Sequence, residues 1–297
     1  MRSAAGNRNS VAGMRWGLIS SAVVAGTVLM MGAAAWAQGP TYTKKVIYSF
    51  AGGSDGADPL AGLVRDGAGN LYGTTYAGGD YGSGTVFRLD TTGKEAVLHS
   101  FSGGPDGGYP YAGLILDAAG NLYGTADAGG THNYGVVFEV PAGGAEGVLY
   151  SFTGTGGDGA DPLAGLVRDA VGNLYGTTNS GGSSGGGIVF KISPAGKEAV
   201  LHSFKGKDGE YPYASVIRDA AGNLYGTTYG GGASGWGTVF EINPTGKETV
   251  PYSFAGAGDG ASPEGCLVQD AAGHLYGTTK YGGALGAGTV FELSPAP

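Results

Sequence analysis

The apolar residues of the chain fall into short runs that are separated by Gly, Asp, Asn and Pro. The first complete set of runs covers residues 60–65, 70–75, 84–89 and 95–101. The runs are rich in Val, Leu, Tyr, Phe and Thr, which favour strands, and the residues between them favour tight turns. In the turn at residues 66–70, Gly69 is expected to supply a positive φ. The pattern predicts four short antiparallel strands in this segment and no helix.

This set of strands recurs along the chain. Asn-Leu-Tyr-Gly-Thr begins at residues 70, 121, 173 and 223, and a fifth copy has His274 in place of Asn. Ser-Phe and Gly-x-Val-Phe recur with nearly the same spacing. Five units of about 51 residues therefore fill residues 38–297 as a single domain. Four antiparallel strands in 40–50 residues are typical of one blade of a β-propeller.

The order of the strands predicts how the propeller closes. Residues 46–50 form a lone strand of the fourth type, and the last unit ends with a strand of the third type at residues 288–293. The first strand can therefore complete the last blade. We predict an all-β, five-bladed β-propeller that is closed by its N-terminal strand. The alternative is an open β-solenoid, which leaves two strand edges exposed.

One position in the first strand of every unit holds a small residue. These residues are Gly62, Gly113, Gly165, Ser215 and Cys266. Five innermost strands converge on a narrow axis, where bulky side chains would collide. We therefore expect these residues to line a central channel, with Cys266 as a small filler rather than a nucleophile.

The composition supports a folded, glycine-rich β protein. Gly provides 64 of the 297 residues, yet 41% of the residues are hydrophobic and only 13% are charged. Disordered chains have few apolar residues and a high net charge, so disorder is excluded. The single Cys rules out an intramolecular disulfide.

The N-terminus predicts export. Arg2, Arg8 and Arg15 precede an apolar stretch at residues 17–34 and an Ala-x-Ala site at residues 35–37. This order is typical of a secretory signal peptide, here residues 1–37, and the alternative is an uncleaved membrane anchor. Without residues 1–37 the net charge is −11. We therefore expect neither nucleic acid nor a membrane as a partner of the processed chain.

The complete unit resembles a known bacterial repeat. Its pattern is Ser-Phe…Gly-x-Asp-Gly…Pro…Asp-x-x-Gly-Asn-Leu-Tyr-Gly-Thr-Thr…Gly-Gly…Gly-Thr-Val-Phe, which is similar to the GloVer repeat of choice-of-anchor tandem repeat proteins. The resemblance covers about residues 44–294. It implies export, often to the cell surface, and no established activity or catalytic residues. Because residues 292–297 contain no C-terminal anchor, we expect a secreted or periplasmic protein.

Alternating strand directions place two sets of loops on one face, which we call the upper face. These loops join the fourth strand to the next unit and the second strand to the third. They vary more between units than the opposite turns do, so they form the candidate binding face. Their aromatic residues suit sugar recognition, although such residues can also simply fill gaps between glycine-rich loops. The candidate ligand-binding residues are Tyr76, Tyr81, Tyr109, Tyr111, Tyr134, Tyr211, Tyr213, Tyr229, Trp236 and Tyr281.

Aspartates of the upper loops are weak candidates for a Ca²⁺ site. One Asp precedes Gly in every unit, and its simplest role is to stabilise a turn. The first and third units add a second carboxylate, which suits an oxygen-ligated cation. The candidate ligands are Asp55, Asp58, Asp158 and Asp161. No other cofactor is expected.

Taken together, these features favour a non-catalytic protein that binds extracellular carbohydrate or a surface partner. The sequence contains no catalytic triad and no histidine spacing typical of a metal site. A polysaccharide-active hydrolase or lyase is the alternative, and it would need two converging carboxylates. The possible contributors are Asp58, Asp80, Asp127, Asp161, Glu210 and Glu264. A purely structural role in the cell envelope is the third possibility.

Overall fold

The computed structural model describes residues 42–295, and the predicted signal peptide lies outside them. Residue contacts divide the chain into Met1–Lys45 and Val46–Pro297. The second unit is described here by itself. Its described residues form strands and turns without a helix, which confirms the all-β prediction.

No segment among residues 42–295 forms a helix that could cross a membrane.

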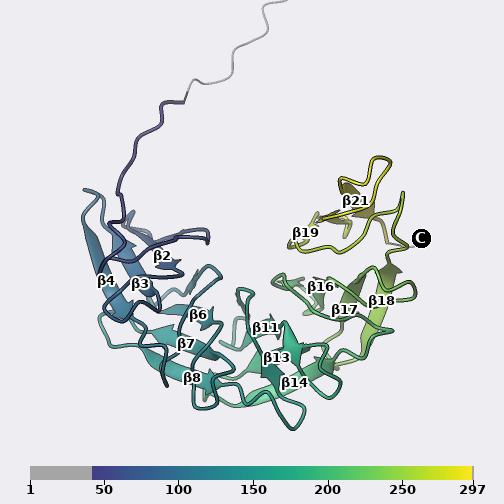
Figure 1. The fold of residues 1–297 in the computed structure, drawn as a ribbon, viewed down its shortest axis with the longest axis horizontal. Coiled ribbons are helices and arrows are strands. Elements are labelled where there is room, and N and C mark those ends of the chain that lie inside the picture. Colours follow the sequence, from purple (N-terminus) through teal and green to yellow (C-terminus); the bar gives the residue numbers. More distant parts are fainter. Residues whose placement is uncertain (1–41, 296–297) are drawn as a thin grey trace, which may run out of the picture. The chain divides into compact units, whose positions relative to one another are not determined.

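Five antiparallel sheets of three or four strands follow one another along the chain (Figure 1). The first four have four strands in chain order, and the last has three. Each sheet begins with a strand of two residues. These are β1 (Val64–Arg65), β5 (Ile115–Leu116), β10 (Val167–Arg168), β15 (Ile217–Arg218) and β19 (Val268–Gln269).

The second and third strands form the centre of each sheet. The second strands have the sequence Leu-Tyr-Gly-Thr-Thr, except in the second sheet, where the sequence is Leu-Tyr-Gly-Thr-Ala. They are β2 (Leu71–Thr75), β6 (Leu122–Ala126), β11 (Leu174–Thr178), β16 (Leu224–Thr228) and β20 (Leu275–Thr279). The third strands are β3 (Thr85–Leu89), β7 (Val136–Val140), β13 (Ile188–Ile192), β17 (Thr238–Ile242) and β21 (Thr289–Leu293). The fourth strands are β4 (Glu95–Ser100), β8 (Gly147–Ser151), β14 (Glu198–Ser203) and β18 (Glu248–Ser253).

A short bridge ties the two upper loops of each unit together. In the third unit it is a pair of two-residue strands, β9 (Gly159–Ala160) and β12 (Ser180–Gly181). The other units have single bridges, which join Ala57 to Ala77, Gly108 to Ala128, Glu210 to Gly230 and Ala261 to Tyr281. The two sets of loops therefore share one face, as the alternating strand directions predict.

The first strands are shorter than the sequence predicts. We expected residues 60–65 to form a strand, but only Val64 and Arg65 pair with β2. Asp58 has a φ of 55°, and Pro59 has no N–H to donate. The chain therefore turns before it can join the sheet. The following turn agrees with the prediction, because Gly69 has a φ of 96°.

The core of each sheet depends on a glycine that faces a phenylalanine. Gly73 is the cross-strand partner of Phe87, and a Cβ at Gly73 would lie 2.8 Å from the Cζ of that ring. In the other four sheets the corresponding distances are 2.5–2.6 Å. The missing side chain of Leu-Tyr-Gly-Thr thus leaves the space into which the Phe of Gly-x-Val-Phe packs.

Each of these phenylalanines also meets the Ser-Phe ring of the preceding unit. The rings are edge to face, with centroids 5.0–5.1 Å apart, a geometry that aromatic pairs favour. The five pairs are Phe50–Phe87, Phe101–Phe138, Phe152–Phe190, Phe204–Phe240 and Phe254–Phe291. Neighbouring sheets are therefore joined by one repeated aromatic contact.

The two ends of the repeat array are incomplete in this structure. Phe50 packs on Phe87, yet residues 46–50 are not part of a strand. Among the described residues, β21 pairs with β20 and with no further strand. Closure of the last blade by residues 46–50 therefore stays a prediction.

The aromatic contact predicts a large effect of Phe204→Ala. Phe204 is fully buried and joins the third and fourth sheets. Its truncation should lower the free energy of unfolding by about 3–5 kcal/mol, because the lost side chain leaves a cavity. Urea unfolding measures the change. Val171→Ala is the control, because Val171 is exposed and its loss should change stability by no more than about 0.5 kcal/mol.

Candidate functional site

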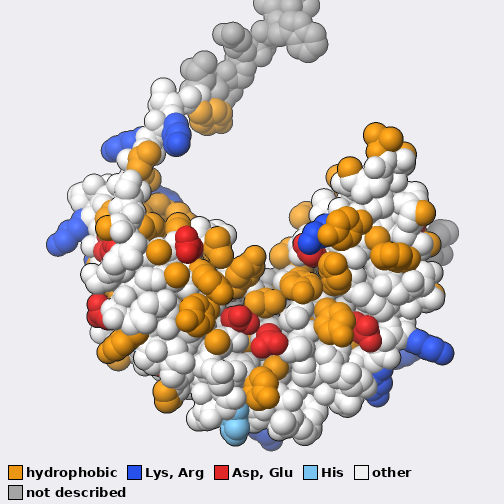
Figure 2. Space-filling model, in the orientation of Figure 1, with side chains coloured by type: hydrophobic (Ala, Val, Ile, Leu, Met, Phe, Trp, Pro, Cys, Tyr) orange, Lys and Arg blue, Asp and Glu red, His pale blue; other side chains and the backbone are white. Residues whose placement is uncertain are grey.

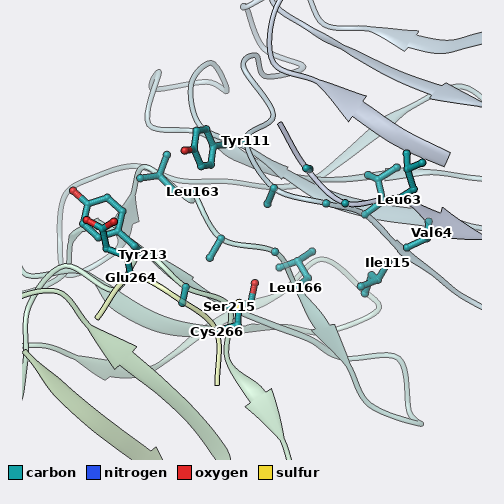
Figure 3. Close-up of a pocket in the computed structure, with 18 residues that line it drawn as sticks. Leu63, Val64, Tyr111, Ile115, Leu163, Leu166, Tyr213, Ser215, Glu264 and Cys266 are labelled. Atoms are coloured by element: carbon teal, nitrogen blue, oxygen red, sulfur yellow. The ribbon is translucent and has the colours of Figure 1, made fainter. Parts of the chain in front are cut away.

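A pocket of about 440 Å³ lies where the first segments of the units converge. Figure 3 shows Tyr111, Leu163, Tyr213 and Glu264 around it, with Ser215 and Cys266 lower in the same view. We call it the central pocket. The space-filling view shows hydrophobic side chains gathered on this face, with acidic groups among them (Figure 2).

The small residues that the sequence places on the axis all line the central pocket. They are Gly62, Gly113, Gly165, Ser215 and Cys266. Their segments lie close together, since a Cβ at Gly113 would be 3.2 Å from the carbonyl oxygen of Gly62. A larger side chain would therefore fill the pocket or push these segments apart. The five small residues therefore line one pocket, whereas a closed central channel stays a prediction.

A strained residue before each proline fixes the rim of the pocket. These residues have φ between 54° and 59°, a region that non-glycine residues rarely occupy. Two backbone hydrogen bonds hold Tyr109 in this conformation: its N–H donates to the carbonyl of Ser83 at 2.7 Å, and its carbonyl accepts from the N–H of Asp127 at 3.3 Å. The five residues are Asp58, Tyr109, Asp161, Tyr211 and Ser262.

Two further positions of each unit lie beside the strained residue, and their chemistry differs from unit to unit. The residue after the proline, which we call the rim position, is Leu60, Tyr111, Leu163, Tyr213 or Glu264. The residue whose N–H bonds to the strained residue, which we call the loop position, is Tyr76, Asp127, Asn179, Tyr229 or Lys280. The backbone is repeated while the side chains are aromatic, acidic, amide, aliphatic or basic. The five units therefore do not form five equivalent sites.

The predicted aromatic residues separate into groups. Tyr111 and Tyr213 line the central pocket, and their exposed fractions are 51% and 40%. Tyr76 packs against Tyr109 and Tyr111 with centroids 5.3 and 6.2 Å away, and Tyr229 packs against Tyr213 at 5.5 Å.

The remaining aromatic residues lie away from the pocket lining. Tyr134 lies against Gly154 and Trp236 against Gly256, so these two fill gaps between loops. Tyr81, Tyr211 and Tyr281 are exposed and do not line the pocket.

Sequence reasoning overlooked Lys280, which lies at the loop position of the fifth unit. Its Nζ is 2.8 Å from Oε1 of Glu264, and it lies 6.0 Å from the ring centroid of Tyr229 and 5.4 Å from that of Tyr281. The signal was available, because Lys280 stands where the first and fourth units have tyrosine after Thr-Thr.

Asp127 of the second unit lies near enough to Asp161 of the third unit to be influenced by its charge. Burial, together with the negative charge of Asp161, raises the pKa of Asp127 to about 6. Asp161 accepts a hydrogen bond from the hydroxyl of Ser180. Asp127 can therefore hold a proton up to about pH 6. Of the other candidate acids, Glu264 lines the central pocket, whereas Asp58, Asp80 and Glu210 do not.

The Ca²⁺ candidates Asp55 and Asp158 already accept hydrogen bonds from their own loops. Asp55 accepts from the N–H groups of Ala51 and Gly53 and from the hydroxyl of Tyr48. Asp158 accepts from the N–H of Thr153 at 2.7 Å and from the hydroxyl of Tyr150 at 3.0 Å. A cation would have to displace these donors. Within residues 42–295, neither Asp55 with Asp58 nor Asp158 with Asp161 belongs to a group of three metal-ligating side chains.

Comparison with known proteins identifies the repeat and a related fold. The model of the family described as the Gloeobacter/Verrucomicrobia repeat matches residues 20–218 and 169–297. No curated protein sequence matches the chain.

Among solved structures, the extracellular domain of a suspected one-component system from B. thetaiotaomicron has a TM-score of 0.51 and 10% identity. The match covers 78% of this chain and 27% of that one, so the chain spans about a quarter of its length. A gluconolactonase from Xanthomonas campestris has a TM-score of 0.48 and 16% identity, covering 79% and 71% of the two chains. A suspected gluconolactonase from a structural genomics consortium has a TM-score of 0.42 and 14% identity, covering 71% and 67%. At such identities the likeness concerns the fold alone, which is all-β and propeller-like.

The buried carboxyl group predicts a pH dependence that Asp127→Asn should remove. The pKa of Asp127 rises from 3.8 to about 6 on folding, so its contribution to stability is complete below 3.8 and is lost as the pH rises to about 6. The melting temperature of Asp127→Asn relative to the wild type should therefore increase between pH 4 and pH 7. Thermal unfolding measures the difference, and a constant difference across this range would contradict the assignment.

Proposed function

The chain belongs to the Gloeobacter/Verrucomicrobia repeat family, and we propose that it is an exported, non-catalytic binding protein that recognises carbohydrate at the central pocket. The observation that carries the proposal is the pair Tyr111 and Tyr213, which expose their rings at the pocket. Aromatic rings stack on the apolar faces of sugars, while nearby polar groups bind hydroxyl groups. A protein partner on the same surface is the competing ligand.

The polar groups around these rings suit a neutral or cationic sugar better than an acidic one. Glu264 lines the pocket, and Asp127 with Asp161 lies at the neighbouring loops. Lys280 is the one basic residue at the loop positions, and Glu264 neutralises it. The processed chain is also strongly acidic, which disfavours anionic ligands in general.

A polysaccharide-active hydrolase or lyase is the second candidate, and one observation favours it. The raised pKa of Asp127 beside the carboxyl group of Asp161 resembles the division between a proton donor and a second carboxylate in sugar hydrolysis. We rank it below binding because Ser180 occupies an oxygen of Asp161, and because Asp127 and Asp161 do not line the central pocket, whereas Tyr111 and Tyr213 do.

We further propose that the five units form a closed ring of five blades in which residues 46–50 pair with β21. Val290 of β21 is 83% exposed, whereas its counterparts Val86, Val137, Val189 and Val239 are fully buried by the next unit. Closure would cover Val290 in the same way. Tyr76 at the loop position of the first unit packs against Tyr109, the strained residue of the second unit. If the fifth unit met the first in the same way, Lys280 would lie beside Asp58, and these two residues carry opposite charges. These two complementarities support a closed ring over an open solenoid.

Export rests on the N-terminal sequence. Three arginines, the apolar residues 17–34 and the Ala-x-Ala site support cleavage after residue 37 and a secreted or periplasmic location.

Binding can be tested with the double variant Tyr111→Ala/Tyr213→Ala on an array of soluble oligosaccharides, followed by calorimetry. We expect the wild type to bind one class of sugar and the double variant to lose at least about tenfold in affinity, as when a stacking contact is removed. Tyr81→Ala is the matched control, because Tyr81 is exposed but does not line the pocket. Equal loss in both variants, or no ligand on the array, would contradict the site. Release of products that Asp127→Asn abolishes would favour the enzyme instead.

Closure can be tested with Val290→Asp, using Val239→Asp as the reference. In a closed ring both aspartates are buried without a partner, so both variants should unfold at clearly lower urea concentrations than the wild type. In an open array only Val239→Asp should do so, because Val290 then remains in solvent. Wild-type stability of Val290→Asp would therefore rule out closure.

A further inference from the structure

A histidine and two carboxylates meet at two of the junctions between neighbouring units. At the junction of the third and fourth units, Nε2 of His202 is 2.9 Å from Oδ2 of Asp208. One ligand atom from each of His202, Asp208 and Glu248 lies within 4.8 Å of the other two. His202 belongs to β14, Asp208 to the following upper loop and Glu248 to β18, so the group joins the outer strands of two sheets.

The junction of the first and second units holds the same three residue types at a wider spacing, and Oδ2 of its aspartate, Asp106, also accepts from the N–H of Ser102. Nε2 of His99 is 3.2 Å from Oδ2 of Asp106 and 3.9 Å from Oε2 of Glu146. The side chain of Glu146 is only 6% exposed, and its Oε1 is buried without a hydrogen-bond partner. Oε1 of Glu248 is unpartnered in the same way. A buried carboxyl oxygen without a donor is unfavourable unless a proton or a cation neutralises it.

We propose that His202, Asp208 and Glu248 bind a divalent transition-metal ion of the Zn²⁺ class, and that His99, Asp106 and Glu146 form a second site of the same kind. One imidazole nitrogen with two carboxylate oxygens is a ligand set that Zn²⁺ accepts, whereas Ca²⁺ takes oxygen ligands alone. Tetrahedral ligands at Zn²⁺ distances lie about 3.3–3.5 Å apart. The three atoms of the His202 group lie within 4.8 Å of one another, so side-chain adjustments of about 1 Å would bring them to that spacing, and the more widely spaced His99 group would need larger ones. The bound ion would join the outer strands of neighbouring sheets.

The other junctions show what the same backbone does without histidine. Tyr48, Tyr150 and Tyr252 take the position of His99 and His202, and each hydroxyl donates to the aspartate of its loop. Glu198, beside Tyr150 and Asp158, also has a buried Oε1 without a partner. The unpaired glutamate is therefore common to the junctions. The imidazole nitrogen distinguishes the two proposed sites, because it supplies a third ligand where tyrosine supplies a hydrogen-bond donor.

This natural variation provides the matched variants. His202→Tyr and His99→Tyr install a residue that the chain itself uses at this position, so the fold should persist. We expect the full-length protein to retain two Zn²⁺ per chain after equilibrium dialysis, measured by elemental analysis. Each single variant should retain one, and the double variant none.

Thermal unfolding gives an independent readout. Zn²⁺ should raise the melting temperature of the wild type and leave that of His99→Tyr/His202→Tyr unchanged, since an ion stabilises only the state that binds it. In the presence of a chelator, the wild type and the double variant should unfold at similar temperatures, which shows that the variant is folded. If the double variant retains as much Zn²⁺ as the wild type, the ions are bound elsewhere, for example at His132, His274 or Cys266, and the proposal is wrong. It is equally wrong if the wild type retains none.

Discussion

The fold depends on the packing of one phenylalanine ring over a glycine. In each unit the ring of the third strand lies above the glycine of the second strand, which it could not do if that residue had a Cβ. The same ring meets the phenylalanine of the preceding unit edge to face. One contact thus fixes both the interior of a sheet and its junction with the neighbouring sheet. The two most recognisable segments of the repeat are therefore two halves of a single packing arrangement.

The aspartates of the repeat illustrate a second constraint, the need to satisfy backbone groups in a chain with so many turns. Asp66 accepts from the N–H and the side-chain amide of Asn70 and from the hydroxyl of Tyr72. These bonds explain why Asp, Asn and Tyr recur together in every unit with little change. Because these carboxylates are occupied in holding turns, a site for ligands has to come from residues that the turns do not use. The rim and loop positions satisfy that condition.

The regular part of the fold was predictable because each strand repeats its own signal. The predicted strands at residues 70–75, 84–89 and 95–101 differ from β2, β3 and β4 by one residue at most at each end. The first strand was not predictable in this way, because its apolar run looks like a strand while the positive φ of Asp58 and the following proline turn it aside. Local residue preferences report which conformations are favourable. They do not report how far a segment can pair when five such segments converge.

The candidate site was only partly accessible from the sequence. Tyr111, Tyr213 and the small residues of the pocket follow from alignment of the units, because position in the repeat indicates position around the axis. The side-chain interactions do not follow from it. The charge of Asp161 acts on Asp127 of the preceding unit, and Lys280 pairs with Glu264 within the fifth unit, through loops whose conformations depend on the strained residues before the prolines.

The strained residues have a consequence for how such a surface can change. Their conformation is held by hydrogen bonds between backbone atoms, so it does not depend on which side chain is present: Asp, Tyr and Ser all occupy it. A substitution at a rim or loop position can therefore alter the ligand without altering the scaffold. In a repeat protein of this kind, new specificities can arise by substitution of single residues at equivalent positions of the five units. Duplication of a unit adds a further set of such positions.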